Sequence, residues 1–447
     1  NKLLNEIDKI ALSGQYEFIN AKIVEKIDGN KINFEINISE SEKFYVEKIN
    51  INGNFNTLEE VIRNNLIIDE GDPFNEILFN KSVNEIQSLG IFKKVKTDIK
   101  EGSDQSFKII NLDVEERPTG EISLSAGFGT DGETIGAGLK ENNFLGKGIK
   151  LNTSVELTAD SIKGGFIYAK PNFNYSDNTL FTSLKSSTSD FLSNSGYKTS
   201  EIGFSLGTKF EQFQNIFLSP EIDFLIEDLE TSDKASSTLK KQEGSYTDLY
   251  FNYSINQDLR DKKFRTEDGY ITVFSQEVPI VSDNAEFANA FEVTKFKKLS
   301  ATSDMVGKIS FFGKTITGLS DDVRISKRLN VPSSRLRGFE RGKVGPVENN
   351  DYIGGNHIST INLSATLPTV VEGLDNLDIG IFFDAANVWG VDYNSSLDDK
   401  NKIRSSTGVA LNLMTPIGPL SFSFANAISK ASTDKTETFR FNLGTQF

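Results

Sequence analysis

Apolar and polar residues alternate along most of the chain after residue 120, with the two-residue period of a β-strand. In residues 377–384 the odd positions carry Leu, Ile, Ile and Phe, and the even positions carry Asp, Gly, Phe and Asp. Sixteen candidate strands follow one another between residues 121 and 446, most of them nine or more residues long. Strands of that length cross a bilayer when tilted, and an even number is typical of bacterial outer-membrane barrels. The pattern predicts a membrane all-β fold over residues 119–447, a 16-stranded antiparallel transmembrane β-barrel.

Residues 1–118 carry a different pattern, in which helical and strand periods mix. Two strands flanking Asp28-Gly29 predict a hairpin, after an amphipathic helix near residues 3–11. The next stretch predicts the order β-α-α-β-β. Its elements are a strand at Tyr45–Ile51, helices at Leu58–Leu66 and Phe74–Leu89, and strands at Ile91–Ile99 and Phe107–Val114.

This order resembles a POTRA domain, an α+β module of the periplasm that docks partners. The runs Ile51-Asn52-Gly53-Asn54 and Leu89-Gly90-Ile91-Phe92 carry the likeness. It implies a complete POTRA domain at residues 43–118 and the C-terminal part of another at residues 1–42. We expect Ile91–Ile99 or Phe107–Val114 to offer a free edge to which a partner adds a strand. Thr57 followed by Glu60 predicts a capping box before the first helix.

The composition of the chain excludes several kinds of partner and of catalytic or metal site. The chain has 48 Lys and Arg against 63 Asp and Glu, a formal net charge of −15, which argues against nucleic acid as a partner. One His and no Cys exclude thiol catalysis, disulfides, and zinc sites built from His or Cys. The lone His357 has no convincing Ser and Asp partners, and no spacing of acidic residues suggests a metal site. We therefore expect no enzyme activity, no cofactor and no metal.

A connector at about residues 315–355 is unusually long for a barrel, and long ordered loops are usually functional. It contains the run Leu336, Arg337, Gly338 and Phe339. If the connector folds into the barrel, the guanidinium of Arg337 needs an acidic partner there. Asp384 is the best candidate, because it lies on the polar, inward phase of its strand.

The run Leu336-Arg337-Gly338-Phe339 closely matches the [V/I]RGF motif in the sixth loop of the BamA family. Further matches follow in the same order as in the family: 143-NFLGKG-148, 354-GGN-356, 382-FFD-384 and the closing 439-FRFNLGTQF-447. Together with the POTRA pattern, the resemblance covers essentially the whole chain. In one respect the chain departs from the family. A strand-12 Glu that also faces the loop arginine in typical members matches Ser364 here, which leaves Asp384 as the main acidic partner.

The BamA family forms the core of bacterial outer-membrane barrel-assembly machines. The resemblance implies a protein of the bacterial outer membrane, with its POTRA part in the periplasm, that folds and inserts other barrels. Its expected partners are unfolded outer-membrane barrel proteins as clients, periplasmic accessory lipoproteins and chaperones, and outer-membrane lipid. A folding template needs an edge that opens, so we expect a lateral seam between strand 1 and strand 16. The seam residues are Gly127, Gly129, Phe439, Phe441, Leu443, Gly444 and Phe447.

Glycine weakens strand interiors, which favours a seam that opens, although these glycines could serve only to relieve crowding. Two other protein classes share the POTRA-plus-barrel plan. A TamA-type assembly factor differs in POTRA number and periplasmic partners. A two-partner secretion pore exports one soluble client. A plain porin needs no POTRA domain.

Overall fold

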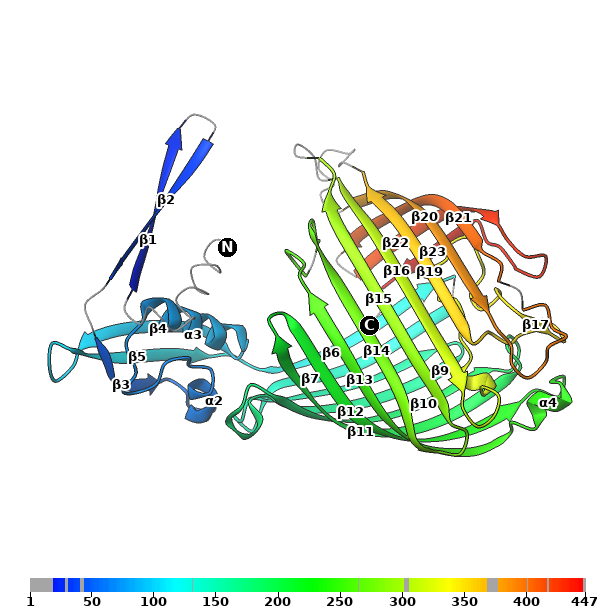
Figure 1. Ribbon diagram of the computed structural model, residues 1–447, viewed down its shortest axis with the longest axis horizontal. Coiled ribbons are helices and arrows are strands. Elements are labelled where there is room, and N and C mark those ends of the chain that lie inside the picture. Colours follow the sequence, from blue (N-terminus) through cyan, green and yellow to red (C-terminus); the bar gives the residue numbers. More distant parts are fainter. Residues whose placement is uncertain are drawn as a thin grey trace. The chain divides into compact units, whose positions relative to one another are not determined.

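The computed structural model describes residues 19–28, 31–40, 44–130, 132–263, 265–300, 305–367, 377–399, 401–415 and 418–444. The chain divides into two units: residues 1–121 with 140–151, and residues 122–139 with 152–447. Figure 1 labels their elements. The helix predicted near residues 3–11 lies outside the described residues. Among the described helices, none is both long and apolar enough to cross a bilayer.

The first unit contains a three-stranded sheet with two helices. β3 (Tyr45–Asn52) runs parallel to β5 (Phe107–Glu116), which pairs antiparallel with β4 (Phe92–Glu101). Helices α2 (Glu59–Arg63) and α3 (Glu76–Ser88) come between β3 and β4, in the predicted order. The expectation that Phe107–Val114 offers a free edge is wrong, because β5 is the central strand and both of its sides are hydrogen-bonded. The outer strands of this sheet are β3 and β4.

A compact apolar core explains why these elements fold together. Alternate residues of the strands and one face of each helix bury their side chains in it. Its fully buried members include Ile49, Ile62, Ile86, Ile110 and Leu112. In the same unit, β1 (Ile19–Asp28) and β2 (Lys31–Glu40) form the predicted hairpin, paired from Ile19↔Glu40 to Asp28↔Lys31. The turn residue Gly29 lies outside the described part of the chain.

The predicted capping box is wrong. Helix α2 begins after Leu58 and has no side-chain cap. The hydroxyl of Thr57 instead accepts a hydrogen bond from Asn143 Nδ2 (2.9 Å), and its backbone N–H donates to Glu116 Oε1 (2.7 Å). The turn that follows Asn143 packs so closely that a Cβ on Gly146 would lie 1.9 Å from the carbonyl oxygen of Asn56. That contact, which no local sequence pattern reports, takes the hydroxyl away from the helix.

The second region is a closed antiparallel barrel of 16 strands, which confirms the predicted fold (Figure 1). Its strands are β6 (Gly120–Gly129), β7 (Gly132–Phe144), β8 (Ile149–Thr158), β9 (Ser161–Lys170), β10 (Thr179–Phe191), β11 (Tyr197–Phe213), β12 (Ile216–Thr231), β13 (Gly244–Asp258), β14 (Gly269–Ser282), β15 (Glu286–Lys298), β16 (Val306–Gly318), β19 (His357–Thr366), β20 (Leu377–Trp389), β21 (Arg404–Thr415), β22 (Gly418–Ser429) and β23 (Phe439–Leu443).

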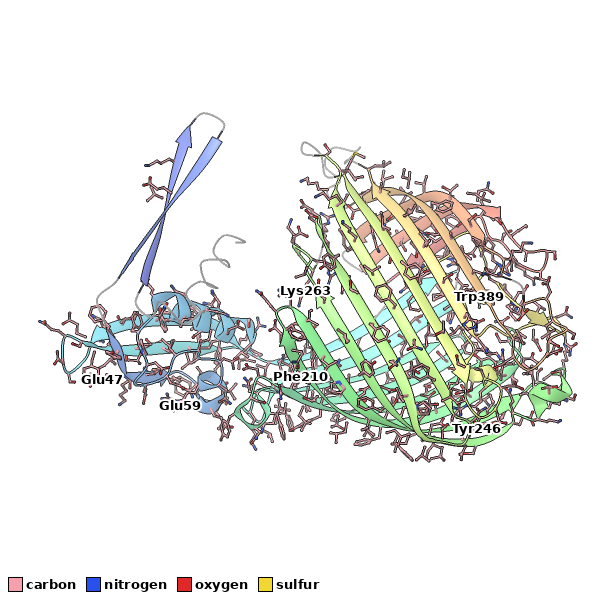
Figure 2. All side chains as sticks on the ribbon, in the orientation of Figure 1. Glu47, Glu59, Phe210, Tyr246, Lys263 and Trp389 are labelled. Carbon is pink, nitrogen blue, oxygen red and sulfur yellow. The ribbon has the colours of Figure 1, made fainter. Side chains whose placement is uncertain are left out.

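The two faces of the barrel wall differ in polarity, as the alternation predicts. On β6 the outward Ile122 and Leu124 are 78% and 83% exposed, and the residues between them are more covered. Figure 2 draws the described side chains, with Trp389 and Tyr246 toward one end of the barrel and Lys263 toward the other. Bare apolar side chains on the outside are what a lipid environment stabilises.

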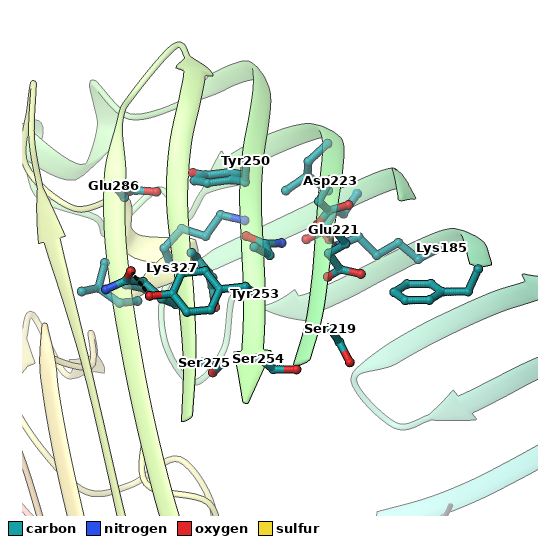
Figure 3. Close-up of a pocket in the computed structure, with 18 of the residues that line it drawn as sticks. Lys185, Ser219, Glu221, Asp223, Tyr250, Tyr253, Ser254, Ser275, Glu286 and Lys327 are labelled. Carbon is teal, nitrogen blue, oxygen red and sulfur yellow. Dashed lines mark hydrogen bonds and ion pairs between the residues drawn. The ribbon is translucent and has the colours of Figure 1, made fainter. Parts of the chain in front are cut away.

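The lumen is polar. A cavity of about 600 Å³ is lined by inward side chains of β10 to β16, charged ones prominent among them. In Figure 3, Lys185 lies near Asp223, and Lys327 reaches in beside Tyr250 and Glu286. The Lys185 ammonium is 3.1 Å from Asp223 Oδ2. Lys327 comes from the connector that follows β16, so that connector lies inside the barrel.

The strands are unequally paired. β12 pairs with β13 without interruption from Ile216↔Gln257 to Leu229↔Gly244. β22 pairs with β23 only from Leu420↔Leu443 to Phe424↔Phe439. Between β23 and β6, within the described residues, the register holds two pairs, Asn442↔Gly129 and Leu443↔Phe128. The barrel therefore closes through its shortest recorded ladder.

Candidate functional site: the inward connector and the closing seam

Arg337 is the centre of the connector's contact with the barrel wall. Its Nε and Nη2 atoms donate to the two carboxylate oxygens of Asp384, at 2.7 and 2.8 Å, and its backbone N–H donates to Oδ2 at 3.2 Å. Its guanidinium carbon lies 3.4 Å from the ring centroid of Phe382. Asp384 is fully buried on β20. A bidentate, stacked arginine holds both the position and the orientation of its loop.

Neighbouring strands complete this anchor. Asn362 on β19 pairs with Asp384 in register and donates from Nδ2 to Asp384 Oδ1 (2.8 Å) and to the carbonyl of Arg335 (2.7 Å). Ser406 on β21 donates to the carbonyl of Arg337. Ser364, the residue that matches the family's strand-12 Glu, does not lie opposite Asp384. Ser364 lies on the same face two residues further on, and its cross-strand partner is Phe382.

The other motif residues pack into the wall. Leu336 and Phe339 are each 1% exposed and belong to one apolar cluster with Ile358 and Val388. Gly338 has φ +87°, and a Cβ there would lie 3.0 Å from the Cβ of Ala425 on β22. Any larger residue would be strained and would also push the loop off the strand. Leu336, Gly338 and Phe339 are thus buried, whereas the side chain of Arg337 stays partly exposed.

A second anchor, which the sequence did not reveal, lies at the start of the connector. Arg324 is fully buried, and its guanidinium meets three carboxylates: Asp248 Oδ2 at 2.6 Å, Glu286 Oε2 at 3.0 Å and Glu227 Oε2 at 3.2 Å. Its backbone N–H also donates to Glu286 Oε1 at 2.7 Å. The three acids come from β12, β13 and β15, and the ring of Tyr246 lies 4.5 Å from the guanidinium carbon.

In the sequence, this anchor could have been indicated only by three acidic residues on the inward phase of nearby strands, Glu227, Asp248 and Glu286. No basic residue was predicted opposite them. Such carboxylates cannot stay charged in a barrel without a cation. Among the residues that the structure describes, no group of three His, Asp or Glu side chains is arranged to hold a metal ion. Arg324 pairs with all three acids instead, and Lys327 adds a second cation 3.7 Å from Glu227 Oε2.

The seam residues meet as follows. Gly129 lies opposite β23 so closely that a Cβ would be 2.6 Å from the carbonyl oxygen of Phe441. Gly444 has φ +110°, and a Cβ there would be 2.3 Å from the carbonyl oxygen of Ala126. A Cβ on Gly127 would make only ordinary contact, 3.4 Å from the carbonyl oxygen of Leu443. Two of the three glycines therefore permit close approach of the strands, as the crowding alternative describes.

Aromatic rings cover the seam on its outer side. Phe441 lies 5.9 Å from Phe128 and 6.1 Å from Phe439, and Phe439 lies 5.0 Å from Phe424, between ring centroids. On the inner side is a cavity of about 650 Å³ lined by residues of both strands and by the connector. The seam is thus backed by space rather than by a packed core. Phe447 lies outside the described residues.

The fold and this site define a class: an outer-membrane β-barrel that follows a periplasmic POTRA domain and holds a long connector inside. The chain belongs to the Omp85 superfamily, whose domain matches residues 143–447. The POTRA family, described as a surface antigen variable number repeat, matches residues 44–117.

Named relatives and solved structures agree with that membership. The chain is 24% identical over 504 residues to the outer membrane protein assembly factor BamA of Neisseria meningitidis, covering 100% of this chain and 62% of the relative. BamA of Neorickettsia risticii is 24% identical over 430 residues, covering 93% and 57%. The chain thus spans about three fifths of the length of these relatives. Both are named as assembly factors, not as enzymes.

The crystal structure of BamA from Haemophilus ducreyi lacking POTRA domains 1–3 has a TM-score of 0.77 at 21% identity, covering 99% of this chain and 92% of that one. CdiB from Escherichia coli has a TM-score of 0.62 at 12% identity, covering 99% and 84%. Likeness at these identities concerns the fold alone.

Proposed function

We propose that this chain folds and inserts β-barrel proteins into the outer membrane, through a seam between β23 and β6 that opens to admit a client strand. The observation that carries the proposal is the two-pair register that closes the barrel. An unpaired backbone group in hydrocarbon costs several kcal/mol. A ladder of two pairs therefore exposes the fewest groups when it parts, and an incoming strand can satisfy them.

The inward connector keeps the rest of the barrel closed while the seam opens. Arg337 and Asp384 join it to β20, and Arg324 joins it to β12, β13 and β15. The wall away from the seam is thus braced from inside. No covalent bond is made or broken in this scheme, so no catalytic group and no cofactor are required.

The POTRA domain, residues 43–118, serves as the docking site for periplasmic accessory lipoproteins and for clients delivered by chaperones. Support comes from its outer strand β4. β4 carries a nearly continuous row of exposed side chains after Phe92, among them Lys94, Lys96 and Lys100. A strand added beside β4 would extend the sheet, whereas the outer edge of β3 is already occupied: Val46 N–H donates to the carbonyl of Asp72 (2.9 Å). Residues 1–42 are proposed to be the end of a preceding POTRA domain.

The test is client insertion by the full-length protein in vesicles of outer-membrane lipid. An unfolded outer-membrane barrel is added, and its folding is followed by protease protection and by the electrophoretic shift of folded barrels. We expect faster insertion than into vesicles without the protein. Equal rates would contradict the proposal. Passage of a soluble client into the vesicle lumen, without insertion, would favour a secretion pore instead.

A further inference from the structure

Arg440 occupies an unexpected place on the closing strand. Its neighbours Phe439 and Phe441 belong to the outer aromatic cover, and Phe439 is 42% exposed. Arg440, one residue along, points to the opposite face and is 6% exposed. The shortest strand of the barrel thus carries a buried arginine on its inner face, where a strand that only paired with its neighbours would need none.

The guanidinium of Arg440 binds the connector. Nη2 donates to the carbonyl oxygen of Phe339 at 2.8 Å, and Nη1 donates to the carbonyl oxygen of Ser333 at 3.0 Å. The carboxylate of Glu437, three residues earlier, pairs with the same guanidinium. One side chain therefore spans two turns of the connector that lie on either side of the Arg337 anchor.

Backbone hydrogen bonds extend the same contact. Glu437 N–H donates to the carbonyl of Gly338 (3.2 Å), and Glu340 N–H donates to the carbonyl of Lys435 (3.1 Å). Lys435 N–H in turn donates to the carbonyl of Lys343 (3.1 Å). The connector thus forms a short antiparallel bridge with the segment that enters β23, centred on Phe339↔Thr436.

These contacts attach β23 to the connector, in addition to its ladder with β22, which runs from Leu420↔Leu443 to Phe424↔Phe439. Toward β6 the described register has two pairs, with one further hydrogen bond from Thr130 N–H to the carbonyl of Phe441 (3.1 Å). Toward the connector there are two bonds from a charged donor and three backbone bonds, all over residues 435–440. Hydrogen bonds to a charged group contribute more than neutral ones.

We propose that Arg440 is a positioning residue that holds the closing strand to the connector, so that β23 parts from β6 only when Arg440 releases the carbonyl oxygens of Ser333 and Phe339. The motif loop and the seam then move as one device: a shift of the loop is transmitted to the seam through Arg440. The consequence for client insertion rests on the proposed function, whereas the coupling of loop to strand does not.

Hydrogen exchange measured by mass spectrometry on the full-length protein in lipid vesicles tests the coupling. In Arg440→Gln we expect the amides of residues 435–444 and of 338–343 to exchange about tenfold faster or more, the factor for losing a hydrogen bond to a charged donor. Arg440→Lys keeps the charge but cannot span both carbonyls. We expect it to restore only part of the protection, and it remains informative if the Gln variant fails to fold.

Arg335→Gln is the matched control, because it removes a connector arginine that binds the far wall. Arg335 Nη2 donates to Glu292 Oε2 (2.8 Å) and its guanidinium stacks on Phe312, while its carbonyl stays bound to Asn362. We expect no change in exchange at β23. Unchanged exchange at β23 in Arg440→Gln, full protection in Arg440→Lys, or equal acceleration in Arg335→Gln would each overturn the inference.

Client insertion is measured on the same samples. If the wild type inserts no client, the proposed function fails, and the exchange data still decide the coupling. If the wild type does insert clients, we expect Arg440→Gln to change the rate of client insertion and Arg335→Gln to leave that rate unchanged.

Discussion

The wall formed by β11, β12 and β13 and the closing region formed by β22, β23 and β6 belong to one barrel but are held in different ways. The wall strands are 17, 16 and 15 residues long and pair over nearly their full length. β23 is five residues long. In the wall, cohesion comes from continuous backbone ladders. In the closing region it comes from close glycine contacts, an aromatic cover and the connector behind it.

The difference indicates where the strands of such a barrel would part at the lowest cost in free energy. Parting two strands in a membrane leaves backbone groups without partners, and each group costs several kcal/mol. The cost therefore rises with the length of the ladder, and among the ladders whose register is described it is smallest between β23 and β6. Both regions are tied to the same connector by arginines, Arg324 at the wall and Arg440 at the closing strand. The connector thus links the wall to the side of the barrel that we propose opens.

The largest effect is expected from Arg324→Ala, which removes the anchor between the connector and the wall. It removes the guanidinium that Glu227, Asp248 and Glu286 share, and leaves them with the ammonium of Lys327, 3.7 Å from Glu227 Oε2. Leaving even one buried charge unpaired costs roughly 3–5 kcal/mol. We expect a loss of barrel stability at least that large, measured by urea unfolding with the electrophoretic shift as readout. Arg324→Lys, with a single ammonium, should fall in between. A loss below that of Arg337→Ala would show that the acids are not held by Arg324.

Arg337→Ala should come next, because it leaves one buried carboxylate, Asp384, in place of three. We expect about 3–5 kcal/mol of destabilisation of the anchored loop. The loop should become accessible to protease, and client insertion should fall. Arg337→Lys is the control, since it keeps the charge but loses the bidentate geometry and the stacking on Phe382. A loop that stays resistant to protease in Arg337→Ala would refute the role of this pair.

A matched pair of glycines compares the two regions directly. A Cβ on Gly207 in the wall would lie 2.7 Å from the carbonyl oxygen of Pro220, and one on Gly129 at the seam would lie 2.6 Å from that of Phe441. The two carbonyl contacts are similar, but in the proposed mechanism only the seam strands move apart. We expect Gly207→Ala to cost roughly 1–3 kcal/mol of barrel stability, the usual cost of overpacking, and Gly129→Ala to cost less than half as much. Equal losses would mean that the seam is as rigid as the wall.

The smallest effect is expected from low pH, through the carboxyl group of Asp392. Asp392, in the loop after β20, accepts hydrogen bonds from Val323 N–H and Asn356 Nδ2 (both 2.9 Å) and pairs with Arg328. Burial alone would raise the pKa of Asp392, but the hydrogen bond from Val323 and the charge of Arg328 outweigh it and lower the pKa below the usual value.

A carboxyl whose pKa is lowered in the folded state stabilises that state above its unfolded pKa, and the stabilisation is lost as the pH falls through the folded value. We therefore expect the protection factors of amides near Val323, relative to the unfolded chain at the same pH, to fall only below about pH 4, the ordinary pKa of Asp. Asp392→Asn should exchange faster at every pH and lose this dependence. An unchanged acid response in Asp392→Asn would assign the effect to another group.

Much of this structure could be predicted from the sequence because lipid and lumen dictate polarity residue by residue. The alternation gives the barrel, and the phase of Asp384 together with the need of Arg337 for a counter-charge gives their pairing. Relations between distant strands do not appear in that pattern. The acids around Arg324 lie on three separate strands, and their convergence depends on the stagger of the barrel.

Periodicity does not show which residue of β19 lies opposite Asp384, because Asn362 and Ser364 share a face; the register gives Asn362. Other errors have the same origin. The central place of β5 is a matter of sheet order, which the strand pattern does not contain. Thr57 lost its predicted capping role to Asn143, a residue far along the chain.

The most direct test of the account is a disulfide across the seam, compared with one across the wall. Phe128 and Leu443 are register partners at the seam, and Phe224 and Leu249 are register partners in the wall. Directly opposite residues in an antiparallel ladder are close enough for a disulfide, and the chain has no native Cys to interfere. We predict that oxidised Phe128→Cys/Leu443→Cys protein stops inserting client barrels and recovers on reduction, while Phe224→Cys/Leu249→Cys protein inserts them at the same rate in both states. Insertion at an undiminished rate by the seam-locked protein would contradict the account.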